Sequence, residues 1–278
     1  MSRVDRMTKL TRLLVCIGAQ KAGTSWLHAM LSRDARLAVC PFVKEVHYFD
    51  HLYNGAQHLV RWRGRHLNKA LRGARADDDA LTPVPELALR LDSSTRSQLL
   101  SDTVDDAWYE ALLRPRAGEL CSIDITPAYA GIGEAGFRHL AGVSENLYVL
   151  FILRNPVHRA WSGLLQGKRK LPGGIEGFIA ERGNDLDFLF ARCTERPDAR
   201  VRNDYVATLD ALYNAGLKEC TLVRFYDDIA ARPAELLDGL YTAIGVPPPS
   251  REVFGDALTR RVYETSPTAL LHELEARL

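Results

Sequence analysis

The segment Gly18-Ala-Gln-Lys-Ala-Gly-Thr-Ser25 has the residue types of an anion-binding loop. It lies between the apolar run Leu13–Ile17, which predicts a strand, and the periodic stretch Trp26–Leu31, which predicts a helix. A strand, a glycine loop and a helix N-terminus aim several backbone N–H groups at one point. The loop departs from the Walker A pattern, because Thr24 follows the second glycine and Lys21 lies inside the loop. Lys21 is predicted to reach a leaving phosphate or sulfonate oxygen; a plain β–α turn is the alternative.

A second candidate anion site follows the strongest apolar run of the chain, Asn146–Leu153. This run predicts a central parallel strand, and Arg154 comes directly after it. Asn155 and Pro156 are predicted to begin a helix, with Ser162 in its second turn. An arginine and a hydroxyl so placed can hold a phosphate, although a surface salt bridge and a solvated serine are the alternative. Two anion sites at the carboxyl ends of two central strands imply a ligand with two separated phosphates.

Candidate proton-transfer groups lie in Lys44-Glu-Val-His-Tyr-Phe-Asp50, after the short strand candidate Leu37–Val39. If the first two strands are parallel neighbours, this segment lies beside the first loop. An extended backbone would direct Glu45 and His47 to one side and Lys44 to the other. A carboxylate in a partly buried pocket can have a raised pKa, whereas an imidazole titrates near neutrality without tuning. For His47, a packing or hydrogen-bonding role is favoured over a role as base.

Strands and helices alternate along most of the chain, which predicts an α/β fold. We expect a single three-layer domain over residues 1–278, with a central, mostly parallel sheet and a P-loop-like strand–loop–helix phosphate site. An irregular helical excursion is expected at about 61–119 and a helical tail at about 250–278. Loops at 61–119 and 171–200 are expected to form a substrate pocket. Further strands are predicted at Leu120–Ile125 and Cys220–Tyr226, and helices at Trp108–Leu113, Pro233–Ile244 and Thr268–Leu278.

The composition argues against several classes of partner. The 278 residues are 46% hydrophobic and 26% charged, and 36 basic against 35 acidic side chains leave a net charge of +1. This balance gives no reason to expect a nucleic acid as partner. No run of 18 apolar residues occurs, and the basic start lacks the apolar region of a secretory signal. We therefore expect no stable membrane insertion and a cytoplasmic location.

No metal site is predicted. The five cysteines are scattered without a C-x-x-C pair, and Cys16 and Cys121 are expected to be buried and unreactive. The acidic run Asp77–Asp79 is expected to be a solvated loop, and Arg260 and Arg261 a solvated pair. Seven histidines show no metal-ligand spacing: His28, His51, His58, His66, His139, His158 and His272.

Together these segments resemble those of the sulfotransferases that use 3′-phosphoadenylyl sulfate (PAPS). Gln20–Trp26 resembles their 5′-phosphosulfate loop, and Leu153–Ser162 resembles their 3′-phosphate motif. Lys44–Asp50 is similar to a segment of the glycan-type members, the heparan sulfate sulfotransferases, in which the glutamate is the catalytic base. Asp124–Tyr129 and Leu222–Ile229 resemble two further segments of the family, so the matches run from residue 13 to about residue 245.

The resemblance implies transfer of a sulfonate group from PAPS to a hydroxyl or amine of a small molecule or glycan, with PAP as product and no metal. Glu45 is then the first choice for the general base, His47 is its competitor, and Lys21 stabilises the leaving group. Ile125 stands where the glycan enzymes carry a lysine, whereas Trp26 fits the small-molecule branch, in which an aromatic stacks on the adenine. The implied donor contacts are Lys21, Ala22, Gly23, Thr24, Ser25, Trp26, Arg154 and Ser162.

Two other classes of protein would also use a strand–loop–helix phosphate site. A nucleotide or small-molecule kinase would need a Walker lysine and a Mg²⁺-binding carboxylate at a later strand end, and the sequence shows neither pattern. A non-catalytic nucleotide-binding module would keep both anion sites but lack a base beside the first. The presence of Glu45 argues modestly against the module.

Overall fold

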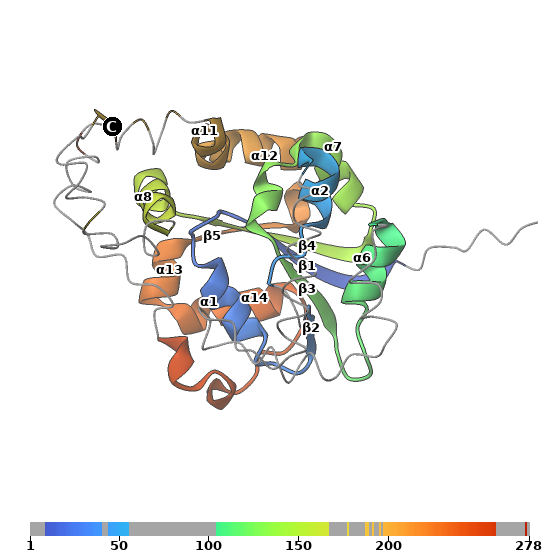
Figure 1. The fold of residues 1–278 in the computed structure, drawn as a ribbon. Coiled ribbons are helices and arrows are strands. Elements are labelled where there is room, and N and C mark those ends of the chain that lie inside the picture. Colours follow the sequence, from blue (N-terminus) through green and yellow to red (C-terminus); the bar gives the residue numbers. More distant parts are fainter. Residues whose placement is uncertain are drawn as a thin grey trace, which may run out of the picture.

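The computed structural model describes residues 9–40, 44–55, 104–166 and 197–259, and single positions at 177, 187, 188, 191, 195 and 276. In these ranges five strands form one sheet in the order β2-β3-β1-β4-β5 (Figure 1). Every pair of neighbouring strands is parallel, which confirms the predicted α/β class. The strands are β1 Leu10–Gly18, β2 Leu37–Val39, β3 Cys121–Ile125, β4 Ser144–Leu153 and β5 Thr221–Phe225.

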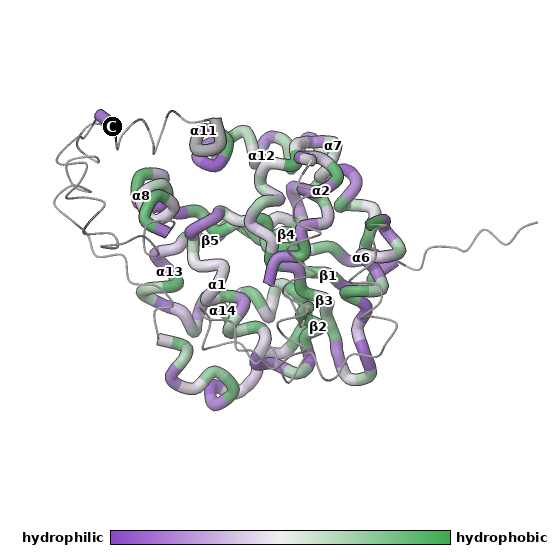
Figure 2. Tube along the Cα trace, viewed as in Figure 1, coloured by the Kyte–Doolittle hydropathy of each residue, from purple (hydrophilic) through white to green (hydrophobic). Residues whose placement is uncertain are grey.

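The middle strand, β1, forms the centre of the core. Its residues 13–17 are fully buried, and it pairs with β3 on one side and β4 on the other. A strand buried on both faces requires a continuous apolar run, which the predicted strand supplies. Figure 2 shows the hydrophobic segments gathered along these central strands. Because the strands are parallel, β1 and β4 end at the same edge of the sheet, and the two candidate anion sites begin there.

Helices flank both sides of the sheet. They are α1 Thr24–Leu31, α2 Tyr48–Asn54, α6 Asp106–Leu113, α7 Gly133–Leu140, α8 Pro156–Gln166, α11 Pro197–Asn203, α12 Tyr205–Asn214, α13 Tyr226–Ala231 and α14 Pro233–Ala243. Figure 1 shows α2, α7 and α12 above the sheet and α1, α13 and α14 below it, which gives the predicted three layers. Short 3₁₀ helices lie at Pro127–Gly131, Lys218–Cys220, Arg251–Val253 and Gly255–Leu258.

Local signals in the sequence fix several helix ends. Asn155 caps α8, because its Oδ1 accepts hydrogen bonds from the backbone N–H groups of Val157 at 2.9 Å and His158 at 3.2 Å. The chain leaves α14 through Gly245, whose φ of 65° lies in the left-handed region that favours glycine. Both ends agree with the sequence prediction.

The segment after β2 differs from the prediction in two ways. Strand β2 pairs with β3 and not with β1, so the first two strands are not neighbours. The backbone of residues 44–50 is also not extended throughout, because α2 begins at Tyr48. His47 precedes it with a φ of 58°, and this left-handed residue redirects the chain.

Several predictions lie outside the described residues, namely those for Asp77–Asp79, for Arg260 and Arg261, for most of residues 171–196, and for the helix Thr268–Leu278. Of the excursion at 61–119, the described part contains α6, which includes the predicted helical window. Cys16 and Cys121 are buried, as predicted. Within the described ranges, no helix is long and apolar enough to cross a membrane, and no three or more His, Cys, Asp or Glu side chains gather as metal ligands.

Candidate functional site

The first loop passes from β1 to α1 through backbone conformations that favour glycine. Gly23 has a φ of 85°, and a Cβ at this position would lie 2.4 Å from Cδ1 of Ile229 on α13. The left-handed backbone therefore favours glycine here, and a side chain would also displace the tip of Ile229. Helix α1 begins at the next residue, Thr24, and no side chain caps its N-terminus. The loop thus presents the positive end of a helix dipole at the carboxyl edge of the sheet.

Lys21 lies between the two predicted anion sites. Its backbone carbonyl accepts a hydrogen bond from Nη1 of Arg154 at 2.7 Å. Its Cγ is 3.9 Å from the point where a Cβ on Gly163 would lie, so the lysine side chain lies close to α8. Ser162, the residue before Gly163, is 8% exposed. The structure therefore brings the loop after β1 and the arginine after β4 into direct contact.

Arg154 has neutral partners in the described part of the chain. Its Cζ lies 4.2 Å from the centroid of the Tyr226 ring, in the geometry of a cation–π contact. Its backbone carbonyl accepts a hydrogen bond from Tyr205 at 2.8 Å, and its buried Nε has no hydrogen-bond partner among the described residues. Burial lowers the pKa of Arg154, although a guanidinium stays charged at physiological pH. We call Lys21, Arg154 and Tyr226 the Arg154 cluster.

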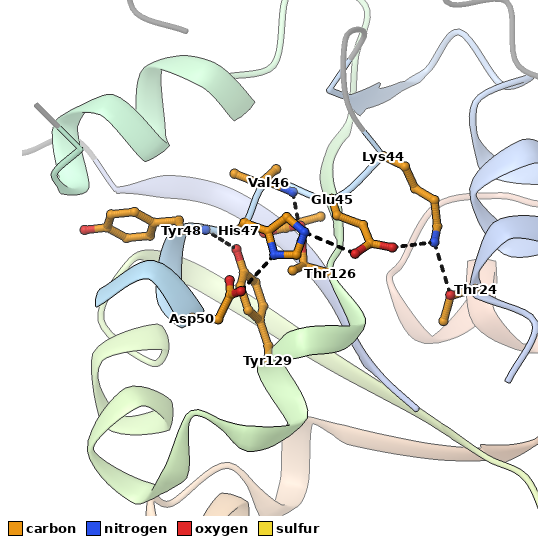
Figure 3. A network of polar contacts seen from close by, with 10 residues as sticks. Thr24, Lys44, Glu45, Val46, His47, Tyr48, Asp50, Thr126 and Tyr129 are labelled. Atoms are coloured by element: carbon orange, nitrogen blue, oxygen red, sulfur yellow. Dashed lines mark hydrogen bonds and ion pairs between the residues drawn. The ribbon is translucent and has the colours of Figure 1, made fainter. Parts of the chain in front are cut away.

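A chain of polar contacts lies beside the first loop (Figure 3). Lys44 Nζ donates to Thr24 Oγ1 at 3.3 Å and to Glu45 Oε1 at 2.8 Å. Glu45 Oε2 lies 3.2 Å from His47 Nε2, and His47 Nδ1 lies 2.8 Å from Asp50 Oδ2. Lys44 therefore does not project away from Glu45, as an extended segment would require. We call Thr24, Lys44, Glu45, His47 and Asp50 the acid–base network.

Charge within this network shifts the pKa of its central members in opposite directions. Burial alone would raise the pKa of Glu45, but the charge of Lys44 and the hydrogen bond from His47 lower it to about 2. The raised pKa expected from the sequence is therefore wrong. Burial disfavours a charged imidazole, yet hydrogen bonds to Asp50 and Glu45 raise the pKa of His47 to about 9. At neutral pH the network holds Glu45 as an anion and His47 as a cation.

Residues at the end of β3 anchor the network. The backbone N–H of Val46 donates to Thr126 Oγ1 at 2.9 Å, and Thr126 donates to Asp124 Oδ1 at 2.6 Å. The backbone N–H of Tyr48 donates to the hydroxyl of Tyr129 at 2.9 Å. Burial raises the pKa of Asp124 to about 6, although the hydrogen bond from Thr126 opposes this effect. These bonds fix Val46 and Tyr48, the residues on either side of His47. Both residues follow β2, which β3 separates from β1 in the sheet.

Two other predicted contact residues, Trp26 and Ala22, lie in the core. Trp26 is 5% exposed, and its indole N–H donates to the carbonyl of Leu258 at 3.2 Å. Stacking on an adenine would require ring surface that this packing encloses. Ala22 is fully buried in the loop, whereas Ser25 is partly exposed. Ile125, which stands where the resemblance to the glycan enzymes would place a lysine, is 1% exposed on β3.

Sequence reasoning gave no role to Asp50, Tyr205 or Tyr226. A helix predicted at Tyr48 would have indicated Asp50, because a residue three positions after His47 lies near it at a helix start. Tyr205 and Tyr226 reach Arg154 from distant parts of the chain, and the sequence carries no local signal for either contact.

The parallel five-stranded sheet, flanked by helices and with a strand–loop–helix element at its centre, defines an α/β protein. The family can be named more closely. A family model described as "Sulfotransferase family" matches residues 14–250. The chain belongs to this family, which confirms the resemblance to sulfotransferases. Among curated proteins, none matches the chain.

Solved structures with a similar fold include three sulfotransferases. A sulfotransferase from Alicyclobacillus acidocaldarius is 17% identical, with a TM-score of 0.52, over 97% of this chain and 92% of that chain. The sulfotransferase domain of the Synechococcus PCC 7002 olefin synthase is 18% identical, with a TM-score of 0.52, over 99% and 97%. The sulfotransferase domain from the curacin biosynthetic pathway is 15% identical, with a TM-score of 0.51, over 97% and 98%. At such identities the likeness concerns the fold alone.

Proposed function

We propose that this protein transfers a sulfonate group from PAPS to a hydroxyl or amine acceptor, a small molecule or a glycan, and releases PAP. One contact supports this most, the 2.7 Å hydrogen bond from Arg154 Nη1 to the carbonyl of Lys21. It joins two cationic sites that follow the adjacent strands β1 and β4. A ligand with two separated phosphates fits such a pair of sites.

The donor would bind across both sites. Its 5′-phosphosulfate would lie against the loop and the first turn of α1, where Gly23, Thr24 and Ser25 offer backbone N–H groups and hydroxyls. Its 3′-phosphate would lie against Arg154 and Ser162. The buried Nε of Arg154, which has no partner in the described part of the chain, supports this assignment, because buried polar groups are ordinarily satisfied.

Transfer requires charge to move toward the donor's 5′-phosphate. The acceptor oxygen or nitrogen attacks the sulfur while the bridging S–O bond breaks. The electron pair of that bond stays on the bridging oxygen, which becomes a 5′-phosphate oxygen of PAP. Lys21, with the hydroxyls of Thr24 and Ser25, would stabilise this developing charge.

The acceptor must also lose a proton, and Glu45 fits this role better than His47. With a pKa of about 9, His47 is already protonated at neutral pH and has no lone pair to offer. Glu45 is ionised and can accept the proton. Its pKa of about 2 makes it a weak base while Lys44 and His47 both hold it, so one of these contacts must loosen before transfer.

Turnover of PAPS against glycans, phenols, alcohols and amines tests this function. The Glu45→Gln variant is the matched control, because it keeps the size and shape of the side chain but cannot accept the proton. Sulfonated product should form with the wild-type protein and fall sharply with the variant. Thermal shifts separate the alternatives, since PAP should stabilise the fold more than ATP–Mg²⁺ or AMP. A larger shift with ATP–Mg²⁺ would favour a kinase.

A further inference from the structure

Lys44 lies beside the N-terminus of α1, a position that favours an anion over a cation. Its ammonium lies 3.3 Å from the hydroxyl of Thr24, the first residue of α1. The N-terminus of a helix carries partial positive charge and favours anions. The carboxylate of Glu45, 2.8 Å away, offsets this repulsion. Lys44 thus contacts both the proposed donor site and the proposed base.

The two oxygens of Glu45 are held differently. Oε2 faces His47, which Asp50 holds from its other side at 2.8 Å, and Asp50 is 3% exposed on α2. Oε1 faces Lys44, a flexible side chain that is 19% exposed. The contact at Oε2 is therefore built into the fold. The contact at Oε1 can be exchanged for another anion that binds at the start of α1.

We propose that donor binding activates Glu45 through Lys44: the donor's anionic 5′ group draws the ammonium away from Glu45 Oε1 and frees this oxygen to accept the acceptor's proton. This inference rests on the proposed function. Without the donor, the ion pair with Lys44 keeps Glu45 a weak base. Glu45 becomes a competent base only when the group to be transferred is in place. Effective binding is then ordered, with the donor before the acceptor.

The electrostatics of Glu45 agree with such a switch. Burial raises the pKa of Glu45, and the charge of Lys44 is the largest of the influences that lower it. Departure of Lys44 removes that influence while the hydrogen bond from His47 stays. The basicity of Glu45 then rises in the donor complex, when transfer needs it.

Calorimetry with PAP on four proteins tests the switch: wild type, Glu45→Gln, Lys44→Met and the double variant. If Glu45 holds Lys44 away from the donor, the glutamine variant releases it. PAP should then bind Glu45→Gln about fivefold or more tightly than wild type, a coupling of ordinary size between linked sites. In the Lys44→Met background the same substitution should gain about twofold at most. Lys218→Met, at an exposed lysine beside Tyr213, should bind PAP like wild type.

The alternative is that Glu45 merely repels the phosphates while Lys44 stays in place. The gain from Glu45→Gln would then be the same with and without Lys44, because fixed charges contribute independently. Equal gains would overturn the switch. Failure of wild type to bind PAP would instead overturn the proposed function.

A crystal structure with PAP tests the switch directly. Lys44 Nζ should contact a 5′-phosphate oxygen and should lie beyond the ion-pair limit of ~4 Å from Glu45 Oε1. Persistence of the Lys44–Glu45 contact beside bound PAP would contradict the switch.

Discussion

The acid–base network and the Arg154 cluster lie at the same edge of the sheet, but their charges are satisfied differently. In the network, Lys44 and His47 alternate with Glu45 and Asp50, so each charge already has an opposite charge as partner. In the cluster, Arg154 contacts a backbone carbonyl and an aromatic ring. An internally paired set of charges suits a region where charge and protons are rearranged. A cation with neutral partners suits a region that binds an external anion.

This contrast predicts that substitutions in the acid–base network and in the Arg154 cluster have different kinetic effects. Loss of a group that acts on charge developed in the transition state lowers kcat. Loss of a group that binds a phosphate equally in the ground and transition states raises KM. Lys21 combines both roles. Its backbone carbonyl contacts Arg154, and its ammonium is proposed to stabilise the leaving group.

The largest effect is expected for Lys21→Ala. Loss of a preorganised donor to a leaving group costs on the order of 10²–10³ in kcat. Steady-state kinetics with PAPS measures this loss, and Lys218→Ala is the control for removal of a lysine charge elsewhere. Near-normal turnover of the Lys21 variant would assign the loop lysine a structural role.

Glu45→Gln should lower kcat by roughly 10²-fold or more, because the amide cannot accept the acceptor's proton. His47→Asn should lower it much less, since His47 is protonated at neutral pH and acts on Glu45 by a hydrogen bond. Parallel kinetics of the two variants decides between them. The reverse ranking would assign the role of base to His47.

Arg154→Ala should mainly weaken donor binding. A hydrogen bond to a charged group contributes about 1.5–3 kcal/mol, so KM for PAPS should rise roughly 10- to 100-fold while kcat changes little. Kinetics at varied PAPS measures both constants. An unchanged KM would remove Arg154 from the donor site and with it the contrast between the two regions.

The last prediction concerns folding stability and the charge of His47, and no change in kinetics. Its pKa is raised from 6.5 to about 9 in the folded protein, so its contribution to stability is complete below pH 6.5 and is lost as the pH rises through about 9. Urea unfolding of wild type should show the free energy of unfolding declining across this window. His47→Gln has no imidazole to titrate and should lack that part of the decline. Parallel curves for the two proteins would show that His47 is not held as a cation.

The positions of most strands could be predicted from the sequence, because these strands are continuous apolar runs flanked by glycine, proline or asparagine. The predicted strand Leu120–Ile125 is observed as Cys121–Ile125, and the helix start at Asn155 and Pro156 was predicted correctly. The sheet order could not be obtained in this way. Strand β3 lies between β1 and β2 and pairs its Cys121 with Leu37 of β2, and local patterns do not record such long-range pairing.

For the site, residue identities were predictable and their electrostatics were not. Glu45 and His47 were selected by chemical type, but the sequence suggested a raised pKa for Glu45, and the structure lowers it. The reason is the charge of Lys44, whose ammonium contacts Glu45, together with the hydrogen bond from His47. An extended segment would have separated Lys44 from Glu45 and left the carboxylate closer to its ordinary pKa.

The central claim is that the loop after β1 and the Arg154 side chain together bind a nucleotide with separated 5′ and 3′ anionic groups. Calorimetry with PAP and with AMP, which differ only in the 3′-phosphate, tests it most directly on wild type and on Arg154→Ala. Wild type should bind PAP at least about tenfold more tightly than AMP, since a charged hydrogen bond contributes on this scale. Arg154→Ala should lose most of this preference. Equal affinities of wild type for PAP and AMP would contradict the account.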